Sequence, residues 1–189
     1  MQSYKRFFDV LVILFFTPVL IPLMVFITII IFFHFDGPVF FWSKRVGKNN
    51  KFFLMPKFRS MISNAPVIGK HQLDNPEIYI TLFGKFLRST SLDELPQIYS
   101  IVLGDMSLVG PRPALFSETY LIKKRNKFGI NELTPGLTGY AQINGRDSIS
   151  VDKKIKYDLY YKNNISIFLD IKIMMITFYK VIFRQDIRF

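Results

Sequence analysis

Two adjacent carboxylates, Asp93 and Glu94, are the clearest candidates for chemistry in this sequence. They lie in the stretch Arg88-Ser-Thr-Ser-Leu-Asp-Glu-Leu-Pro-Gln97, in which an arginine precedes them and a proline follows. An aspartate near a helix N-terminus stays ionised, so it can attack a phosphorus atom or bind a hard cation. Because successive helical residues point in different directions, the two carboxylates suit separate tasks better than sharing one proton.

The same residues also fit a purely structural role. Ser91 and Glu94 have the spacing of a capping box, in which the serine caps a helix and the glutamate bonds back to the serine N–H. Asp93 would then only complement the helix dipole. However, a helix N-terminus also attracts phosphate groups, since its first N–H groups have no partner within the helix. The spacing by itself leaves both interpretations open.

A second candidate, Arg112, is placed between two prolines in Gly110-Pro-Arg-Pro113. The following proline favours an extended backbone at the arginine, and the preceding one stiffens the approach to it. A guanidinium on such a restricted backbone is suited to binding a phosphate group through two parallel hydrogen bonds. The alternative is that the tripeptide is simply a stiff loop.

The composition favours anionic partners and excludes several kinds of site. The chain has 189 residues, half of them hydrophobic, and carries a net charge of +11. This charge favours nucleic acid, an acidic membrane surface or a phosphorylated substrate as partner. The absence of cysteine excludes disulfides and thiolate metal sites. With only two histidines as well, a bound metal is expected to be a hard, oxygen-binding ion such as Mg²⁺.

The N-terminal segment has the length and composition of a membrane helix. Residues 10–33 contain no charged side chain, and about 20 apolar residues are enough to cross a bilayer. Pro18 and Pro22 interrupt the segment and predict a sharp bend. Cations flank both sides, so the positive-inside rule favours both ends in the cytoplasm. A re-entrant helix satisfies this rule, and an ordinary kinked transmembrane helix is the alternative.

Aromatic and β-branched residues predict two short strands, residues 39–42 and 51–55, joined by a basic turn into a hairpin. Lys57-Phe-Arg-Ser-Met61 follows and places two cations around an aromatic residue. Lys57 and Arg59 fit either a substrate role or a basic face that meets solvent or lipid headgroups.

Helices are predicted from apolar spacing, basic last turns and a glycine stop after residue 103. They cover residues 97–103 and 117–127, a segment with apolar positions 151, 155 and 159, and an apolar tail at 165–183 that packs in the core or lies at the interface.

Two turn signals, Pro135-Gly136 and Asn144-Gly145, enclose Gln142 and precede Arg146. The simplest interpretation is a plain hairpin. In such a hairpin, Gln142 and Arg146 would flank the turn and could reach a nucleotide or a pyrophosphate.

A series of motifs extends over nearly the whole chain. Lys5, Arg6 and Asp9 lead into the Pro-containing apolar segment, and behind it follow Lys44-Arg-Val-Gly47, Lys57-Phe-Arg-Ser-Met61, Leu92-Asp-Glu-Leu-Pro-Gln97, Gly104-Asp-Met-Ser107, Gly110-Pro-Arg-Pro113, Pro135-Gly-Leu-Thr-Gly139 and Ala141-Gln-Ile-Asn-Gly-Arg146. In this order and number they are highly specific. The chain resembles the bacterial sugar transferase family, the small monotopic phosphoglycosyl transferases.

The resemblance, together with the elements above, implies an α+β protein in two parts. Residues 1–35 are expected to form a Pro-broken re-entrant membrane helix. Residues 36–189 are expected to form a small, mostly helical catalytic domain with a short β-hairpin and interfacial helices. The protein is expected at the cytoplasmic face of the bacterial inner membrane, as a monotopic protein in contact with anionic lipid. A symmetric homodimer is compatible with the sequence.

The resemblance also implies an activity. The family transfers a phospho-sugar from a nucleotide diphosphate sugar, here expected to be a UDP-sugar, to undecaprenyl phosphate, a polyprenol phosphate, with Mg²⁺ as cofactor. This transfer is the first membrane step of glycoconjugate synthesis. By the same match, Asp93 is the nucleophile that forms a phosphoglycosyl-aspartate, and Glu94 assists in metal binding or in leaving-group stabilisation. The implied substrate-binding residues are Lys57, Arg59, Arg88, Arg112, Gln142 and Arg146.

Two other functions compete with this enzyme hypothesis. The first is a non-catalytic scaffold that its positive charge holds on the membrane. The second is a nucleic-acid-binding protein, which the net charge suggests. However, the lysines are spread over several elements, and no recognition helix or RNA-binding signature occurs. Nucleic acid is therefore not an expected partner.

Overall fold

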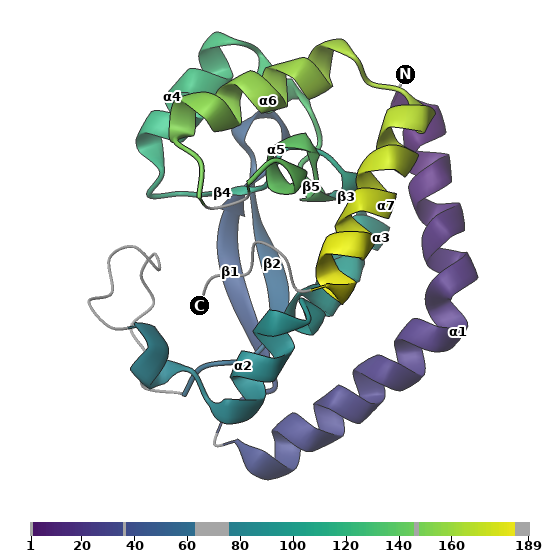
Figure 1. The fold of residues 1–189 in the computed structure, drawn as a ribbon, viewed down its shortest axis with the longest axis vertical. Coiled ribbons are helices and arrows are strands. Elements are labelled where there is room, and N and C mark those ends of the chain that lie inside the picture. Colours follow the sequence, from purple (N-terminus) through teal and green to yellow (C-terminus); the bar gives the residue numbers. More distant parts are fainter. Residues whose placement is uncertain (1, 36, 63–75, 146–147, 184–189) are drawn as a thin grey trace.

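The computed structural model describes residues 2–35, 37–62, 76–145 and 148–183. Helices surround a three-stranded antiparallel sheet and a smaller pair of parallel strands, so the predicted α+β class is confirmed. Figure 1 shows the long N-terminal helix along one side of the molecule and the β-hairpin running through its middle. The division into residues 1–35 and 36–189 stays a prediction.

Helix α1 (Gln2–His34) is one continuous helix that contains both Pro18 and Pro22. In Figure 1 it changes direction in its middle part. That the prolines break the helix there, and that it re-enters the membrane, stay predictions. Its segment Tyr4–His34 has a mean hydropathy of 2.9 and is long and apolar enough to cross a membrane by length and composition.

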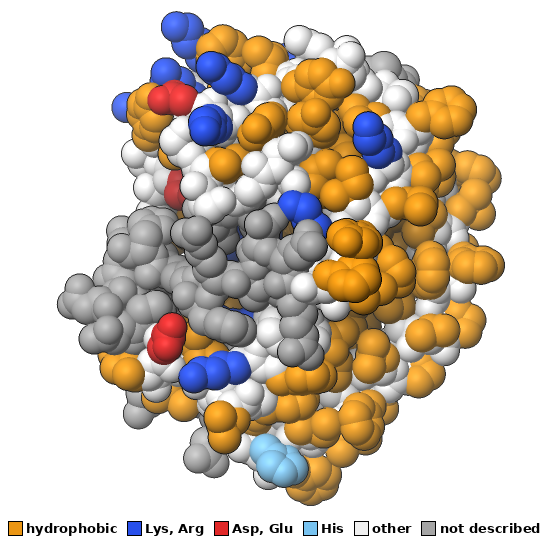
Figure 2. Space-filling model, viewed as in Figure 1, with side chains coloured by type: hydrophobic (Ala, Val, Ile, Leu, Met, Phe, Trp, Pro, Cys, Tyr) orange, Lys and Arg blue, Asp and Glu red, His pale blue; other side chains and the backbone are white. Residues whose placement is uncertain are grey.

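Both halves of α1 pack against the rest of the protein. Ile13 joins a buried cluster that includes Met55 of the hairpin, whereas Ile27 and Ile31 join a second cluster around Phe58. Most of the remaining side chains of the helix are exposed, and Phe15 has 78% of its surface accessible. Figure 2 shows hydrophobic side chains gathered on the side of the molecule where α1 and α7 lie. Such a large apolar surface marks contact with membrane or protein.

The predicted hairpin is confirmed and is longer than expected. Strand β1 (Phe40–Val46) pairs antiparallel with β2 (Phe52–Phe58), and a short strand β4 (Ala114–Leu115) pairs with the other edge of β1. The connection begins at Gly47, whose N–H bonds to the Lys51 carbonyl. Asn49 and Asn50 adopt positive φ there, which asparagine tolerates better than most residues.

Helix α2 (Leu82–Ser89) begins at Thr81, whose hydroxyl accepts a hydrogen bond from the Gly84 N–H. The helix approaches the chain after β2 so closely that a Cβ on Gly84 would lie 1.9 Å from the Ser60 carbonyl oxygen. A 3₁₀ turn, η4 (Leu92–Gln97), leads from α2 into α3 (Ile98–Leu103). The predicted stop of α3 at Gly104 is confirmed by its left-handed backbone.

The plain hairpin predicted around Pro135 and Asn144 is wrong. Strand β5 (Gly136–Thr138) pairs parallel with β3 (Ser107–Val109), and the short helix α5 (Tyr140–Ile143) follows directly. Glycine is needed here for close backbone contact, because a Cβ on Gly136 would lie 2.0 Å from the Gly110 nitrogen. Pro135-Gly136 is a turn signal, but β5 pairs with the distant strand β3 and not with a neighbouring strand of a hairpin.

The other predicted helices are confirmed as α4 (Thr119–Lys127), α6 (Val151–Asn163) and α7 (Ile167–Ile182). Helices α4 and α6 share a buried cluster with Ile130, and α7 contributes the fully buried Ile173 to another. The opposite side of α7 exposes Phe168, Met175 and Phe178. This two-sided character fits the predicted position at an interface, which stays a prediction.

The contact between α2 and Ser60 gives a direct test of the fold. We expect Gly84→Ala to lower the free energy of unfolding by about 1–3 kcal/mol, because a backbone carbonyl has to move to admit the methyl group. Thermal unfolding in detergent measures the loss. Lys85→Ala, at an exposed position of the same helix, is the matched control and should change stability little. Equal melting temperatures for the two variants would contradict the close approach.

Candidate active site

The two carboxylates lie in a turn that does not have the geometry of a capping box. Ser91 precedes η4 in a left-handed conformation with φ of 55°, and its side chain caps no N–H group of the turn. The Glu94 side chain turns to a lysine on another element. The predicted capping box of Ser91 and Glu94 is therefore wrong. A non-glycine residue held at positive φ is strained, and such residues concentrate at functional sites.

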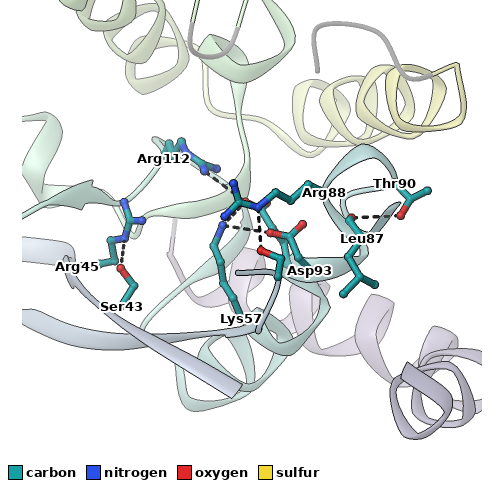
Figure 3. A network of polar contacts seen from close by, with 10 residues as sticks. Ser43, Arg45, Lys57, Leu87, Arg88, Thr90, Asp93 and Arg112 are labelled. Carbon is teal, nitrogen blue, oxygen red and sulfur yellow. Dashed lines mark hydrogen bonds and ion pairs between the residues drawn. The ribbon is translucent and has the colours of Figure 1, made fainter. Parts of the chain in front are cut away.

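Lys57 of β2 lies close to both carboxylates, and Figure 3 shows it beside Asp93. Its Nζ atom is 2.7 Å from Glu94 Oε1 and 3.8 Å from Asp93 Oδ2. Both carboxylates are nearly inaccessible, with 8% of Asp93 and 7% of Glu94 exposed. A buried carboxylate is costly unless it is paired with cations or hydrogen-bond donors. The hairpin thus supplies the charge that lets η4 be buried.

Two arginines complete the cluster, one beside each carboxylate. Arg112 reaches Glu94 Oε1 with its Nη2 atom at 3.3 Å. Arg88 lies next to Asp93 and donates from Nε to the Ser60 hydroxyl at 2.8 Å. Burial lowers the pKa of the Arg88 guanidinium, and the nearby Asp93 acts in the opposite direction. An arginine remains charged at neutral pH in spite of such a shift.

The other predicted substrate-binding residues are Arg59, Gln142 and Arg146. Arg59 follows Lys57 by two positions at the end of β2 and is half-buried. Gln142 lies on α5, where its side-chain oxygen borders Gly139 beside the Gly110 carbonyl. The amide atoms of Gln142 are buried and make no hydrogen bond within the part of the chain that is described. Arg146 lies outside the described residues.

Comparison with known proteins identifies the group to which this arrangement belongs. The family described as bacterial sugar transferase matches residues 1–184. The chain belongs to the bacterial sugar transferase family. It is 38% identical to an uncharacterized sugar transferase, EpsL, of Bacillus subtilis, and the match covers 97% of this chain and 90% of the relative.

Two further relatives have substrates in their names. The undecaprenyl-phosphate galactose phosphotransferase of Salmonella typhimurium is 34% identical over 96% of this sugar transferase chain, which spans 41% of that protein's length. The UDP-glucose:undecaprenyl-phosphate glucose-1-phosphate transferase of Klebsiella pneumoniae is 38% identical over 94% of the chain, and 40% of that protein is covered.

Lys57, Arg88, Asp93, Glu94 and Arg112 are among the candidates that the sequence predicted, but the residues that contact them were not predicted. Ser60, which binds Arg88, belongs to a motif in which only the cations drew attention. Arg45 was noted as part of a motif, and its contact with the Pro113 carbonyl was not foreseen. The position of Arg45 in a motif was the one feature of the sequence that could have marked it as a supporting residue. No feature of the sequence distinguished Ser60 from the other serines.

The charge balance of the site can be tested through stability. Lys57→Met removes a cation that lies 2.7 Å from Glu94, so we expect the free energy of unfolding to fall by about 1–3 kcal/mol. A second substitution, Glu94→Gln, removes the carboxylate charge and should recover part of the loss. Lys51→Met, at an exposed position of the same hairpin, is the control. If Lys57→Met unfolds at the same denaturant concentration as Lys51→Met, the lysine does not stabilise the carboxylates.

Proposed function

We propose that this chain transfers a phospho-sugar from a nucleotide diphosphate sugar to undecaprenyl phosphate, and that a UDP-sugar is the donor. The observation that carries the proposal is the buried pair Asp93 and Glu94 beside the cations Lys57, Arg88 and Arg112, in a chain of the bacterial sugar transferase family. Relatives whose names contain UDP-glucose and undecaprenyl phosphate support these substrate classes.

In the proposed reaction, a carboxylate oxygen of Asp93 attacks the phosphorus atom that carries the sugar. The bond from this phosphorus to the bridging oxygen breaks, and the nucleoside monophosphate leaves with the electron pair. A phosphate oxygen of undecaprenyl phosphate then attacks the same phosphorus. The Asp93 carboxylate is released, and the product is a polyprenyl diphosphate sugar. The double displacement lets a soluble donor and a lipid acceptor use one site in turn.

The cations suit this chemistry, because phosphoryl transfer depends mainly on positioning and on stabilising negative charge. Lys57 and Arg112 both contact Glu94 and are held in place before a substrate binds. Arg88 lies beside Asp93 and can balance the charge of the attacking carboxylate. Together with Arg59 near the end of β2, these three cations would provide a positively charged binding site for a pyrophosphate.

We also assign Mg²⁺ to Asp93 and Glu94. The donor set fits this ion, which proteins often hold through one or two carboxylates while substrate phosphates supply further oxygens. Asp93 and Glu94 are neighbours in η4, and both are almost fully buried. In the described residues no group of three or more His, Cys, Asp and Glu side chains could hold a metal without substrate. When bound, the ion would neutralise part of the pyrophosphate charge.

For α1 we propose a re-entrant path with both ends at the cytoplasmic face. Lys5, near its beginning, pairs with Asp170 of α7, and Ile31, near its end, is buried with Leu87 of α2. Both ends therefore contact the same body. A straight helix of 33 residues would be about 50 Å long, so it would carry one end across the bilayer and away from that body.

The covalent step predicts a specific adduct. Incubation with UDP-sugar and Mg²⁺, without acceptor, should release the nucleoside monophosphate and leave a phospho-sugar on the peptide that contains Asp93. Intact-protein mass spectrometry detects the added mass. Asp93→Ala should abolish the adduct while the protein stays folded, because it removes the only proposed nucleophile. Asp105→Ala, at an exposed carboxylate twelve positions further on, should form the adduct normally.

Two outcomes would contradict this mechanism. An active Asp93→Ala enzyme would exclude Asp93 as nucleophile. Failure of the wild-type protein to release nucleoside monophosphate from any of a panel of nucleotide sugars would favour the membrane scaffold instead.

The re-entrant path predicts that both flanks of α1 are accessible from the same side. Because the chain has no native cysteine, Ser3→Cys and Lys51→Cys can be labelled singly with a membrane-impermeant maleimide. Both should react only after the cytoplasmic face is exposed. Phe15→Cys, in the apolar part of the helix, is the control and should stay unlabelled from either side. Labelling of Ser3→Cys and Lys51→Cys from opposite faces would establish a spanning helix.

A further inference from the structure

The segment Pro111-Arg112-Pro113 is held mainly through its carbonyl groups. Its two prolines have no N–H group to donate, yet each of its three consecutive carbonyl oxygens accepts a hydrogen bond from a different element. Gly136 N–H of β5 donates to Pro111 at 2.9 Å. Arg125 Nη1 of α4 donates to Arg112 at 2.8 Å, and Arg45 Nη1 of β1 donates to Pro113 at 3.3 Å.

The middle donor, Arg125, is itself fixed by a buried carboxylate. Its Nε and Nη2 atoms both bind Asp158 Oδ2, at 3.0 and 2.7 Å. Arg125 has 9% of its surface exposed and Asp158 has 1%. Asp158 lies on α6 one turn after Ile155, a member of the cluster between α4 and α6. Two bonds to the carboxylate leave the guanidinium little freedom, so its third bond has a defined direction.

Stability alone does not explain this pair. A buried ion pair has a large desolvation cost, and apolar residues of similar size are often as stable or more so. The pair differs from an ordinary core contact because its remaining hydrogen bond ends on the backbone of Arg112. From there the Arg112 side chain extends to Glu94. A continuous path of contacts thus connects α6, through α4, to the active site.

We propose that Arg125, oriented by Asp158, is a positioning residue for the Arg112 guanidinium, and that Arg45 supports it from the other side. Neither residue touches the substrates in this role. Together they fix the backbone on which Arg112 stands, so that its guanidinium lies at Glu94 before the donor pyrophosphate arrives. This inference rests on the proposed function of the site.

A double-mutant cycle tests the proposal. Arg125→Lys keeps the charge but cannot bind Asp158 and the Arg112 carbonyl in the same geometry. We expect it to lower kcat/KM for the nucleotide sugar by about 10- to 100-fold, as small displacements of a substrate-binding group do. In an Arg112→Lys background, Arg125→Lys should lower kcat/KM by less than about 3-fold, because its effect on activity depends on the Arg112 side chain. The same loss in both backgrounds would overturn the proposal.

A second pair of variants separates positioning from packing. Arg125→Met with Asp158→Leu replaces the ion pair by an apolar pair and should keep the melting temperature near that of the wild type. Adduct formation on Asp93 should still slow as in Arg125→Lys. Full activity in this stable double variant would reduce the pair to a packing contact. Lys124→Met is the matched control on α4, since Lys124 pairs with the exposed Asp152, and its activity should be unchanged.

An NMR measurement tests the positioning of Arg112 without depending on enzyme activity. The ¹⁵Nε signal of Arg112, assigned by its loss in Arg112→Lys, should shift or broaden in Arg125→Lys and stay unchanged in Lys124→Met. If the wild-type protein processes no nucleotide sugar, the proposed function fails, and this signal still decides on the positioning. An unchanged Arg112 signal in Arg125→Lys would overturn the positioning role alone.

Discussion

The need to neutralise Glu94 is the constraint on which the rest of the site depends. This carboxylate is almost completely buried, so it requires cations close by. Lys57 comes from the hairpin and Arg112 from the Pro-bounded loop, and both bind the same oxygen of Glu94. Three segments that are distant in sequence are therefore joined at one atom. The fold around them serves to bring a strand end, a 3₁₀ turn and a rigid loop to this point.

Helix α1 is connected to the same region through polar contacts at its N-terminal end. Arg6 donates to the carbonyls of Ile101 and Val102 at the end of α3, and Asp9 accepts from the Leu108 N–H of β3. Since β3 runs directly into the loop that carries Arg112, the position of α1 bears on the site. On the proposed function, this connection would couple the depth of the helix in the bilayer to the place where a lipid phosphate reacts.

Local sequence signals predicted most helices and strands. The features that these signals did not predict depend on contacts between distant parts of the chain. The hairpin, the stop at Gly104 and the helix at residues 117–127 follow from propensity, spacing and capping, which a short window contains. The parallel pairing of β3 with β5 depends on residues about thirty positions apart, and the Pro135-Gly136 signal could not reveal it. The spacing of Ser91 and Glu94 left a capping box open because spacing does not report φ, and the positive φ of Ser91 became visible only in the fold.

The residues of the charged cluster were predictable by type, but their pairing was not. Motifs and charge selected Lys57, Arg88, Asp93, Glu94 and Arg112, yet nothing in the sequence told which cation serves which carboxylate. The structure places Arg112 on Glu94 and Arg88 beside Asp93. This division has a chemical consequence on the proposed function. The nucleophile keeps an arginine for its own charge, and the cations on Glu94 are held ready for the phosphates.

The contacts of Lys57 and Arg112 with Glu94 also have a use before the substrate binds. Cations that pointed into solvent would have to lose water and side-chain freedom as the donor binds, and the loss would weaken transition-state stabilisation. Glu94 removes much of this cost beforehand by holding Lys57 and Arg112 in a defined position. A binding pyrophosphate can then share these cations without assembling them. On the proposed function, Glu94 would contribute to catalysis through the order it imposes on Lys57 and Arg112, in addition to the proposed role as a ligand of Mg²⁺.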